Sequence, residues 1–93
     1  MVSVTQRFHP HPEVVDTELE GQEMVLLHLE SMQYYSLNLT GMRIWQGLKQ
    51  GLNLQEISRR LQTEFEVEAD RAERSVLALV AELSERHLVQ RYP

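Results

Sequence analysis

Three segments in the first half of the chain show the alternation of side chains that is typical of β-strands. Residues 14–19 mix β-branched and acidic residues and end at a turn around Gly21. Residues 23–29 are apolar on both alternating sets, which predicts a central strand covered on two faces. Residues 33–37 return with aromatic side chains on both sets, so the three segments together predict an antiparallel meander.

The hydrophobic period changes from two to about 3.6 residues at Thr40, which we expect to be the N-cap of a first helix. This helix is expected to end at Gly51. A second helix begins at a capping box, in which the side chain of Asn53 accepts from the amide of Glu56, and it ends near Glu64. Two amphipathic helices of moderate length therefore follow the predicted sheet.

A third, longer helix is expected to run to about His87. Its apolar stripe consists of Ala72, Val76, Leu79, Val80 and Leu83. Residues 88–92 form a short extended end, and residues 1–13, which contain two prolines two positions apart, form a lead-in arm. The order of elements predicts an α+β fold for residues 14–93, similar to a winged helix-turn-helix, with a three-stranded antiparallel sheet followed by three helices.

The composition limits the classes of protein to which the chain can belong. Its 93 residues, 42% of them hydrophobic, suffice for one small core but leave little room for a deep active site. The absence of cysteine excludes disulfides and thiolate metal sites and fits a reducing cytoplasm. A net charge of −5 counts against nucleic-acid binding. The longest apolar run has four residues, so we expect neither a signal peptide nor a membrane span.

Candidate chemistry is sparse along the chain. His9 and His11 flank a proline in the predicted arm without a further ligand at metal-binding spacing, and His28 is expected to be a packed or rim residue on the second strand. No serine lies in a nucleophile elbow, and no glycine-rich loop is present that could hold a phosphate. We therefore expect no metal, no cofactor and no enzymatic activity.

The hydrophobic core alone does not account for two features. Tyr34 and Tyr35 are neighbours on a strand, so their rings point to opposite faces and only one of them enters the core. Their strand is an edge without Lys or Pro, which makes it an aggregation hazard, a docking site for a partner strand, or an edge shielded by the arm. Leu77 lies roughly 100° from the centre of the stripe on the third helix, where it either packs on the second helix or widens an apolar surface.

One segment has a distinctive pattern: residues 34–41 read YYSLNLTG, and Ile44 and Trp45 follow. The pattern continues with Leu54, Glu56 and Ile57 in the second helix and with Leu83, Leu88 and Val89 at the close. With these residues the chain resembles the PqqD-like family of peptide-recognition domains, which serve pathways that make ribosomally synthesised, post-translationally modified peptides. It looks most like the leader-binding subunit of split lasso-peptide systems, with pyrroloquinoline-quinone-type maturation second. His87 stands where the family usually has glycine.

The resemblance implies that the leader of a precursor peptide adds as a further strand to the third strand and lies in a groove against the third helix. The implied peptide-binding residues are Gln33, Tyr34, Tyr35, Ser36 and Leu37 on the strand and Glu73, Leu77, Val80 and Ser84 on the helix. The domain would present the captured peptide to a separate leader protease or modifying enzyme, without chemistry of its own.

Two alternatives remain open at this stage. An open edge strand could equally mediate homodimer formation. A winged helix-turn-helix regulator would instead place the arginines of its third helix in the major groove of DNA. Arg71 and Arg74 are interleaved with acidic residues, however, and such a pattern is more typical of a solvated helix face.

Overall fold

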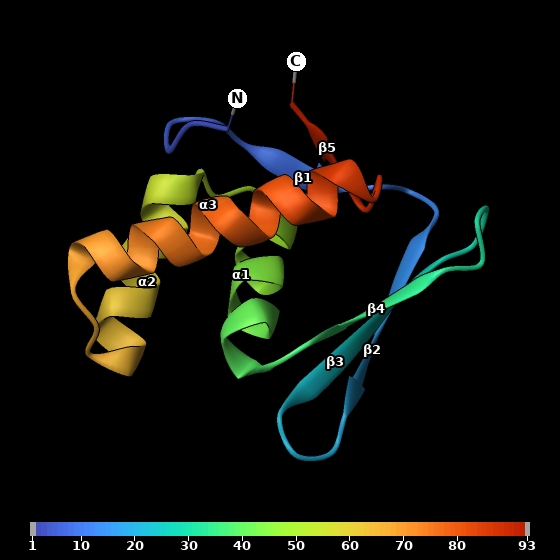
Figure 1. Ribbon diagram of the computed structural model, residues 1–93, viewed down its shortest axis with the longest axis horizontal. Helices are drawn as coiled ribbons and strands as arrows, with labels where there is room; N and C mark the ends of the chain where they lie inside the picture. Colours follow the sequence, from blue (N-terminus) through green and yellow to red (C-terminus); the bar gives the residue numbers. More distant parts are fainter. Residues whose placement is uncertain (1, 93) are drawn as a thin grey trace.

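The computed structural model describes residues 2–92 and has two small antiparallel sheets and three helices (Figure 1). The elements are β1 (Phe8–Pro10), β2 (Val14–Leu19), β3 (Glu23–His28), β4 (Tyr34–Leu37), α1 (Leu39–Lys49), α2 (Leu54–Phe65), α3 (Ala69–Glu85) and β5 (Val89–Arg91). Strands β2, β3 and β4 form the predicted three-stranded antiparallel meander, and the helices follow it. The predicted α+β class is confirmed. Among residues 2–92, no helix combines the length and apolar character needed to cross a membrane.

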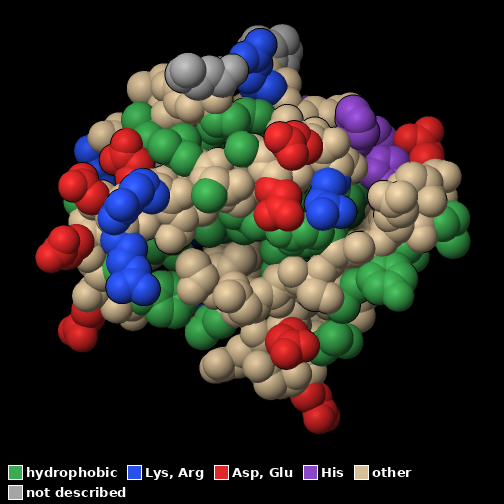
Figure 2. All heavy atoms as spheres, viewed as in Figure 1, with side chains coloured by type: hydrophobic (Ala, Val, Ile, Leu, Met, Phe, Trp, Pro, Cys, Tyr) green, Lys and Arg blue, Asp and Glu red, His purple; other side chains and the backbone are tan. Residues whose placement is uncertain are grey.

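The β2–β3–β4 sheet is covered by the helices on one face only. On β3, the side chains of Met24, Leu26 and His28 are buried, whereas Val25 and Leu27 on the opposite face are half-buried. The prediction of a central strand covered on two faces is therefore wrong. The outward-facing apolar residues are shielded only in part, by their neighbours on β2 and β4, and the sheet extends away from the helices in Figure 1. In Figure 2, which has the same view as Figure 1, acidic side chains lie at the bottom of the molecule, where Figure 1 shows the β2–β3 turn.

Helix α1 is the central element of the fold, because it contacts β1, β3, β4 and α2. Its N-cap is Asn38, whose Oδ1 accepts from the amide of Gly41 at 2.9 Å, so the prediction of Thr40 as N-cap is wrong by two positions. The helix ends at Lys49 with Gln50 as C-cap, and Gly51, the predicted terminator, follows in a left-handed conformation with φ +80°. At Gly47, an added Cβ would lie 2.7 Å from a side-chain atom of Ile57, so α1 and α2 approach closely there.

A hydrogen bond joins α1 to the first strand of the sheet. Trp45 is 1% exposed, and its indole Nε1 donates to Asp16 Oδ2 at 2.7 Å. Lys49, one turn further along α1, contacts the same oxygen at 2.8 Å. Burial of the carboxyl raises the pKa of Asp16, but the hydrogen bonds from Lys49 and Trp45 and the charge of Lys49 outweigh this, so the pKa lies below its ordinary value of 3.8.

Helices α2 and α3 pack against each other beside α1. The predicted capping box at the start of α2 is confirmed, since Asn53 Oδ1 accepts from the amide of Glu56 at 2.8 Å and Glu56 Oε1 accepts from the amide of Asn53 at 2.9 Å. The buried stripe of α3 consists of Ala72, Val76, Val80 and Leu83. Leu79, which the sequence pattern places in this stripe, is only half-buried at its border.

The first residues of the chain are joined closely to the rest of the domain. β1 pairs with β5, and Phe8 is a core residue with 3% exposure. The carbonyls of Val4 and Gln6 accept from the first amides of α2 at 2.9 and 3.1 Å. The expected lead-in arm thus contributes a strand, which tolerates Pro10 because it lies in a two-stranded sheet and not at the centre of a larger one.

The end of α3 has the hydrogen bonds of a Schellman motif. The amide of Leu88 donates to the carbonyl of Leu83 at 2.9 Å, and the amide of His87 donates to the carbonyl of Ser84 at 3.1 Å. His87 has φ +59°, the left-handed conformation that favours glycine. A histidine in place of the usual glycine therefore leaves a strained backbone at His87. Helix α3 itself ends at Glu85, close to the predicted boundary.

We expect Asp16→Ala to lower the free energy of unfolding by about 1–3 kcal/mol, because it leaves the buried Trp45 N–H without an acceptor. Asp16→Asn retains an acceptor but not the charge. Since the pKa of Asp16 is lowered in the folded state, its contribution is present above the unfolded pKa and is lost as the pH falls through the folded value. Urea unfolding between about pH 5 and pH 2 should therefore show a smaller loss of stability for Asp16→Asn than for the unmodified chain. Equal losses would contradict the assignment.

We expect His87→Gly to raise the free energy of unfolding by about 1 kcal/mol, since glycine adopts the left-handed conformation without steric cost. The larger entropy of glycine in the unfolded chain offsets part of this gain. The matched control is His87→Ala, which removes the imidazole but keeps the Cβ, and it should give no increase. Thermal or urea unfolding measures both changes. An equal increase in the two variants would place the effect in the imidazole and not in the backbone.

Candidate functional site

The outer edge of β4 is open. Within residues 2–92, β4 pairs with β3 alone, and its sequence Tyr34–Leu37 contains neither Lys nor Pro to block a further strand. The amide of His28 donates to the carbonyl of Gln33 at 2.9 Å, and the register from Leu27–Tyr34 to Met24–Leu37 continues from this pair. In such a ladder every second residue bonds inward, so the N–H and C=O groups of Tyr34 and Ser36 point to the open edge.

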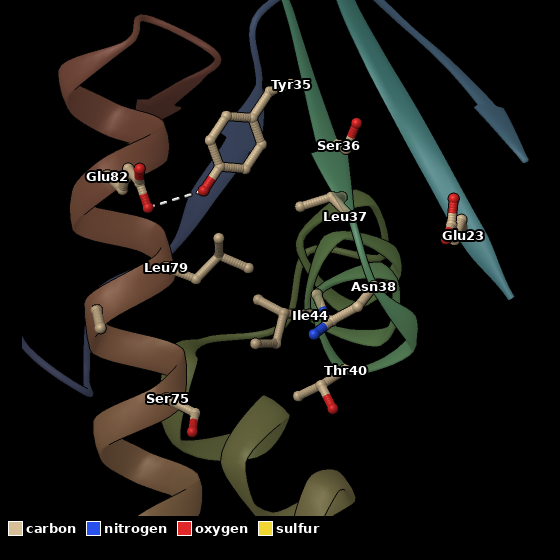
Figure 3. A pocket seen from close by; sticks show the side chains of 12 residues that line it. Glu23, Tyr35, Ser36, Leu37, Asn38, Thr40, Ile44, Ser75, Leu79 and Glu82 are labelled. Atoms are coloured by element: carbon tan, nitrogen blue, oxygen red, sulfur yellow. Dashed lines mark hydrogen bonds between the residues drawn. The ribbon is translucent and has the colours of Figure 1, made fainter.

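A groove of about 770 Å³ lies between this edge, the start of α1 and one flank of α3 (Figure 3). Leu37, Ile44 and Leu79 point toward one another across it and supply its apolar surface. The remaining lining consists of Glu23, Tyr35, Ser36, Asn38, Thr40, Gly41, Ser75, Ala78 and Glu82. A hydrogen-bonding edge beside an apolar groove fits an extended peptide, with its backbone on β4 and every second side chain in the groove.

Tyr35 bridges the groove from β4 to α3. Its hydroxyl donates to Glu82 Oε2 at 2.7 Å, the bond drawn in Figure 3. The Arg86 guanidinium lies 5.2 Å from the centroid of the Tyr35 ring and 3.7 Å from Glu82 Oε1. Burial, the hydrogen bond to Glu82 and the charge of Glu82 raise the pKa of Tyr35 above its ordinary value of 10.0, while the charge of Arg86 acts in the opposite direction. The bridge fixes the separation of β4 and α3 at one point of the groove.

The structure brings together three of the five strand residues singled out from the sequence. Tyr35, Ser36 and Leu37 line the groove. Of the two tyrosines, Tyr35 is the one whose ring enters it, and Tyr34 is 73% exposed on the other face of the sheet. Gln33 lies at the start of β4, beside a separate polar hollow of about 560 Å³.

The four helix residues singled out from the sequence lie elsewhere on α3. Val80 is 0% exposed and belongs to the core. Glu73 and Leu77 line a shallow depression of about 270 Å³ together with Asp70 and Arg74. Ser84 is half-buried and lines neither this depression nor the groove. None of the four residues lies with Tyr35 in the groove.

The groove uses the opposite flank of α3, which consists of Ser75, Ala78, Leu79 and Glu82. At about 100° per residue, Leu77 and Ser75 lie at similar angles on the two sides of the buried stripe. A helical pattern marks both flanks equally, so it contains no signal that tells which flank faces β4. Leu79 could have been found as the half-buried border of the stripe, but Glu82 and Ser75 carry no such signal.

A cluster of His11, His28 and Glu30 forms away from the groove, with nitrogen and oxygen atoms within 4.8 Å of one another. Nδ1 of His11 accepts from the amide of Glu13 at 3.0 Å, and Nδ1 of His28 accepts from the amide of Glu30 at 3.2 Å. An imidazole that accepts at Nδ1 carries its proton on Nε2, whereas a metal-bound histidine donates its second N–H to a neighbour. The cluster does not fit a metal ion without breaking both hydrogen bonds.

The fold is that of a small α+β domain with a winged helix-turn-helix outline, and comparison with known proteins places it more narrowly. Residues 23–89 match the family described as Coenzyme PQQ synthesis protein D (PqqD), so the chain belongs to the PqqD family. The family resemblance inferred from the sequence is confirmed. No curated protein sequence matches the chain.

Two solved structures are closely similar to this one. "TbiB1 in Complex with the TbiA(beta) Leader Peptide" is 29% identical with a TM-score of 0.83, over 91% of this chain and 98% of that chain. "Lasso peptide synthetase B1 complexed with the leader peptide" is 34% identical with a TM-score of 0.83, over 90% of this chain and 98% of that chain. Both similar structures contain a bound leader peptide, and the second is that of a lasso peptide synthetase B1.

We expect Glu82→Gln to lower the pKa of Tyr35 toward its ordinary value, because the substitution removes the carboxylate charge that opposes ionisation of the phenol. Absorbance of the tyrosinate as a function of pH measures this. Tyr35→Phe identifies which of the three tyrosine titrations belongs to Tyr35. An unchanged titration in Glu82→Gln would mean that the bridge across the groove does not form in solution.

Proposed function

We propose that this chain is a non-catalytic leader-peptide-binding protein of a pathway for ribosomally synthesised, post-translationally modified peptides, of the lasso type. It captures the leader of the precursor and presents the rest of the peptide to a separate processing enzyme. The observation that carries this proposal is the open edge of β4 beside an apolar groove, in a fold that two B1 proteins share in complex with leader peptides.

The leader binds by strand addition to β4. Tyr34 and Ser36 offer their backbone groups, which allow about four hydrogen bonds of ~0.5–1.5 kcal/mol each. Side chains of alternate leader residues enter the groove and pack against Leu37, Ile44 and Leu79, at ~1.5–3 kcal/mol for each buried large apolar side chain. These terms offset the cost of ordering a flexible leader and leave a micromolar Kd within reach.

The proposed peptide-binding set differs from the set implied by the resemblance on the helix side. Tyr34, Tyr35, Ser36 and Leu37 remain in it, with Gln33 at the end of the edge. On α3, Ser75, Ala78, Leu79 and Glu82 take the place of Glu73, Leu77, Val80 and Ser84. The carboxylates of Glu23 and Glu82 border the groove and favour leaders with Lys or Arg near them, chiefly through the association rate.

The processing enzyme is a leader protease or a modifying enzyme, and the domain itself supplies binding without chemistry. The groove is lined by hydroxyl, amide and carboxylate groups and by apolar side chains, and no histidine or cysteine is among its lining residues. Glu82 accepts from the Tyr35 hydroxyl, and within residues 2–92 no carboxylate or imidazole is hydrogen-bonded to the hydroxyl of Ser36, Thr40 or Ser75, as activation of a nucleophile would require. Catalysis therefore belongs to the partner, and the domain raises the local concentration of the substrate.

The two alternatives from the sequence have less support. Self-pairing through β4 would occupy the edge that the leader uses, so it competes with the proposed function. DNA binding would require a basic face, whereas Arg74 on α3 lies beside Asp70 and Glu73 around the same shallow depression.

We expect Leu79→Glu to weaken leader binding by at least about tenfold, because a charged side chain would replace an apolar one that the leader covers. Leu77→Glu is the matched control: it makes the same substitution on a half-buried leucine of the same helix, on the flank away from β4. Fluorescence anisotropy with the labelled leader of the chain's own precursor gives the Kd. The TbiA(beta) leader peptide serves as a second probe.

Circular dichroism should show that both variants fold. Equal weakening in both, or weakening by Leu77→Glu alone, would place the leader on the other flank of α3.

Strand addition is tested on the peptide side, with leaders that carry an N-methyl group at single positions. Methylation should weaken binding at alternate positions only, since every second amide of an added strand faces β4. A uniform effect along the leader would exclude strand addition.

A further inference from the structure

The face of the β2–β3–β4 sheet that points away from the helices is apolar. We call it the outer sheet face and define it by Val15, Leu19, Val25, Leu27, Leu29 and Tyr34. Four of these side chains remain 43–73% exposed. The register places Val15 opposite Leu27 and Leu27 opposite Tyr34, so an apolar row crosses all three strands. In Figure 2, hydrophobic side chains lie along the border of the molecule on the side of this sheet.

Carboxylates lie at both ends of the outer sheet face. Residues 13–37, which form the whole sheet and its turns, contain six acidic residues and neither Lys nor Arg. Glu13 and Glu30 lie at one end, where the carbonyl of Glu13 accepts from the amide of Leu29, and Glu20 and Glu23 lie at the β2–β3 turn. The other two acids, Asp16 and Glu18, lie opposite the inward-facing Leu26 and Met24 on the helical side of the sheet, where Lys49 compensates Asp16.

This charge distribution decides between a second copy and a different partner. Two copies that met through the outer sheet face would bring their acidic borders together, and like charges across an interface are costly. A partner with an apolar centre and a border of Lys and Arg would bury the same row of side chains with favourable charge pairs. Tyrosine is enriched among the residues that contribute most to binding energy, and Tyr34, at the β4 edge of the patch, is its most exposed member.

We propose that the outer sheet face is the docking surface for the processing enzyme, which meets it with an apolar patch bordered by Lys and Arg side chains. This inference rests on the proposed function, because a leader strand added to β4 extends the same sheet. An enzyme on the outer sheet face then lies beside the bound leader, next to Tyr34 and Ser36 at the shared edge. The leader and the enzyme use different surfaces of one sheet and do not compete.

The experiment uses the full chain, its precursor peptide and the purified enzyme that processes this precursor. Two quantities are measured: the Kd of the labelled leader for the chain, and the rate of processing of the precursor in the presence of the chain. Val15→Lys changes the apolar row on the strand farthest from β4. It should lower the processing rate by at least about tenfold and leave the leader Kd within about twofold. Tyr92→Lys, at a residue 45% exposed outside this sheet, is the matched control and should change neither quantity.

The two proposals fail in different ways. If the unmodified chain does not bind its leader, the proposed function is rejected by the Kd alone. If Val15→Lys keeps the leader Kd and also keeps the processing rate, the outer sheet face is not the docking surface. Light scattering tests whether a second copy of the chain occupies the outer sheet face. A dimer of the unmodified chain that Val15→Lys dissociates would assign this face to a second copy and overturn the proposal. Val15→Lys is checked by thermal unfolding, because lysine has a lower strand propensity than valine.

Discussion

The burial of Trp45 against the sheet is the constraint on which the arrangement of the molecule depends. The indole lies in the core and its N–H needs an acceptor, which Asp16 supplies from β2. This bond holds α1 against the inner face of the sheet. Because α1 begins directly after β4, the position of α1 also restrains the end of β4. Helix α2 packs closely on α1 at Gly47, and α3 packs on α2. The groove lies between β4, the start of α1 and one flank of α3.

An open edge strand is an aggregation hazard in most proteins. Here the edge of β4 is restrained by contacts with α3. The bond from Tyr35 to Glu82 and the nearby Arg86 connect the edge to α3, so β4 is restrained although β3 is its only partner strand within residues 2–92. The acidic residues around the sheet oppose association of like copies. Recognition through backbone groups places few demands on the sequence of a bound strand, whereas the apolar lining around Leu79 selects for particular side chains. A site of this kind can thus tolerate variation along the backbone-paired strand and still select for the side chains that enter the groove.

Much of the fold follows from local signals. The capping box at Asn53 and the termination of α1 by Gly51 were predicted correctly, because each depends on residues adjacent in the chain. The N-cap of α1 was misplaced by two residues, since Asn38 and Thr40 are both good capping residues and the end of β4 decides between them. The pairing of β1 with β5 had no signal at all, because its two strands are three residues each and lie at opposite ends of the sequence. Long-range pairs of this kind become visible only after the chain has folded.

The sequence by itself determined the order of the meander and the three helices, most of the buried stripe of α3, the unguarded edge at β4 and the family to which the chain belongs. It did not determine which flank of α3 faces that edge. Helical periodicity gives angles around an axis, and Leu77 and Ser75 lie at nearly mirrored angles about the same stripe. Only the packing of α3 on α2, with α1 between α2 and the sheet, turns Ser75, Leu79 and Glu82 toward β4 and leaves Leu77 on the other side. The choice between two mirrored flanks is a property of three-dimensional packing, because a one-dimensional pattern cannot encode on which side of a helix another element will lie.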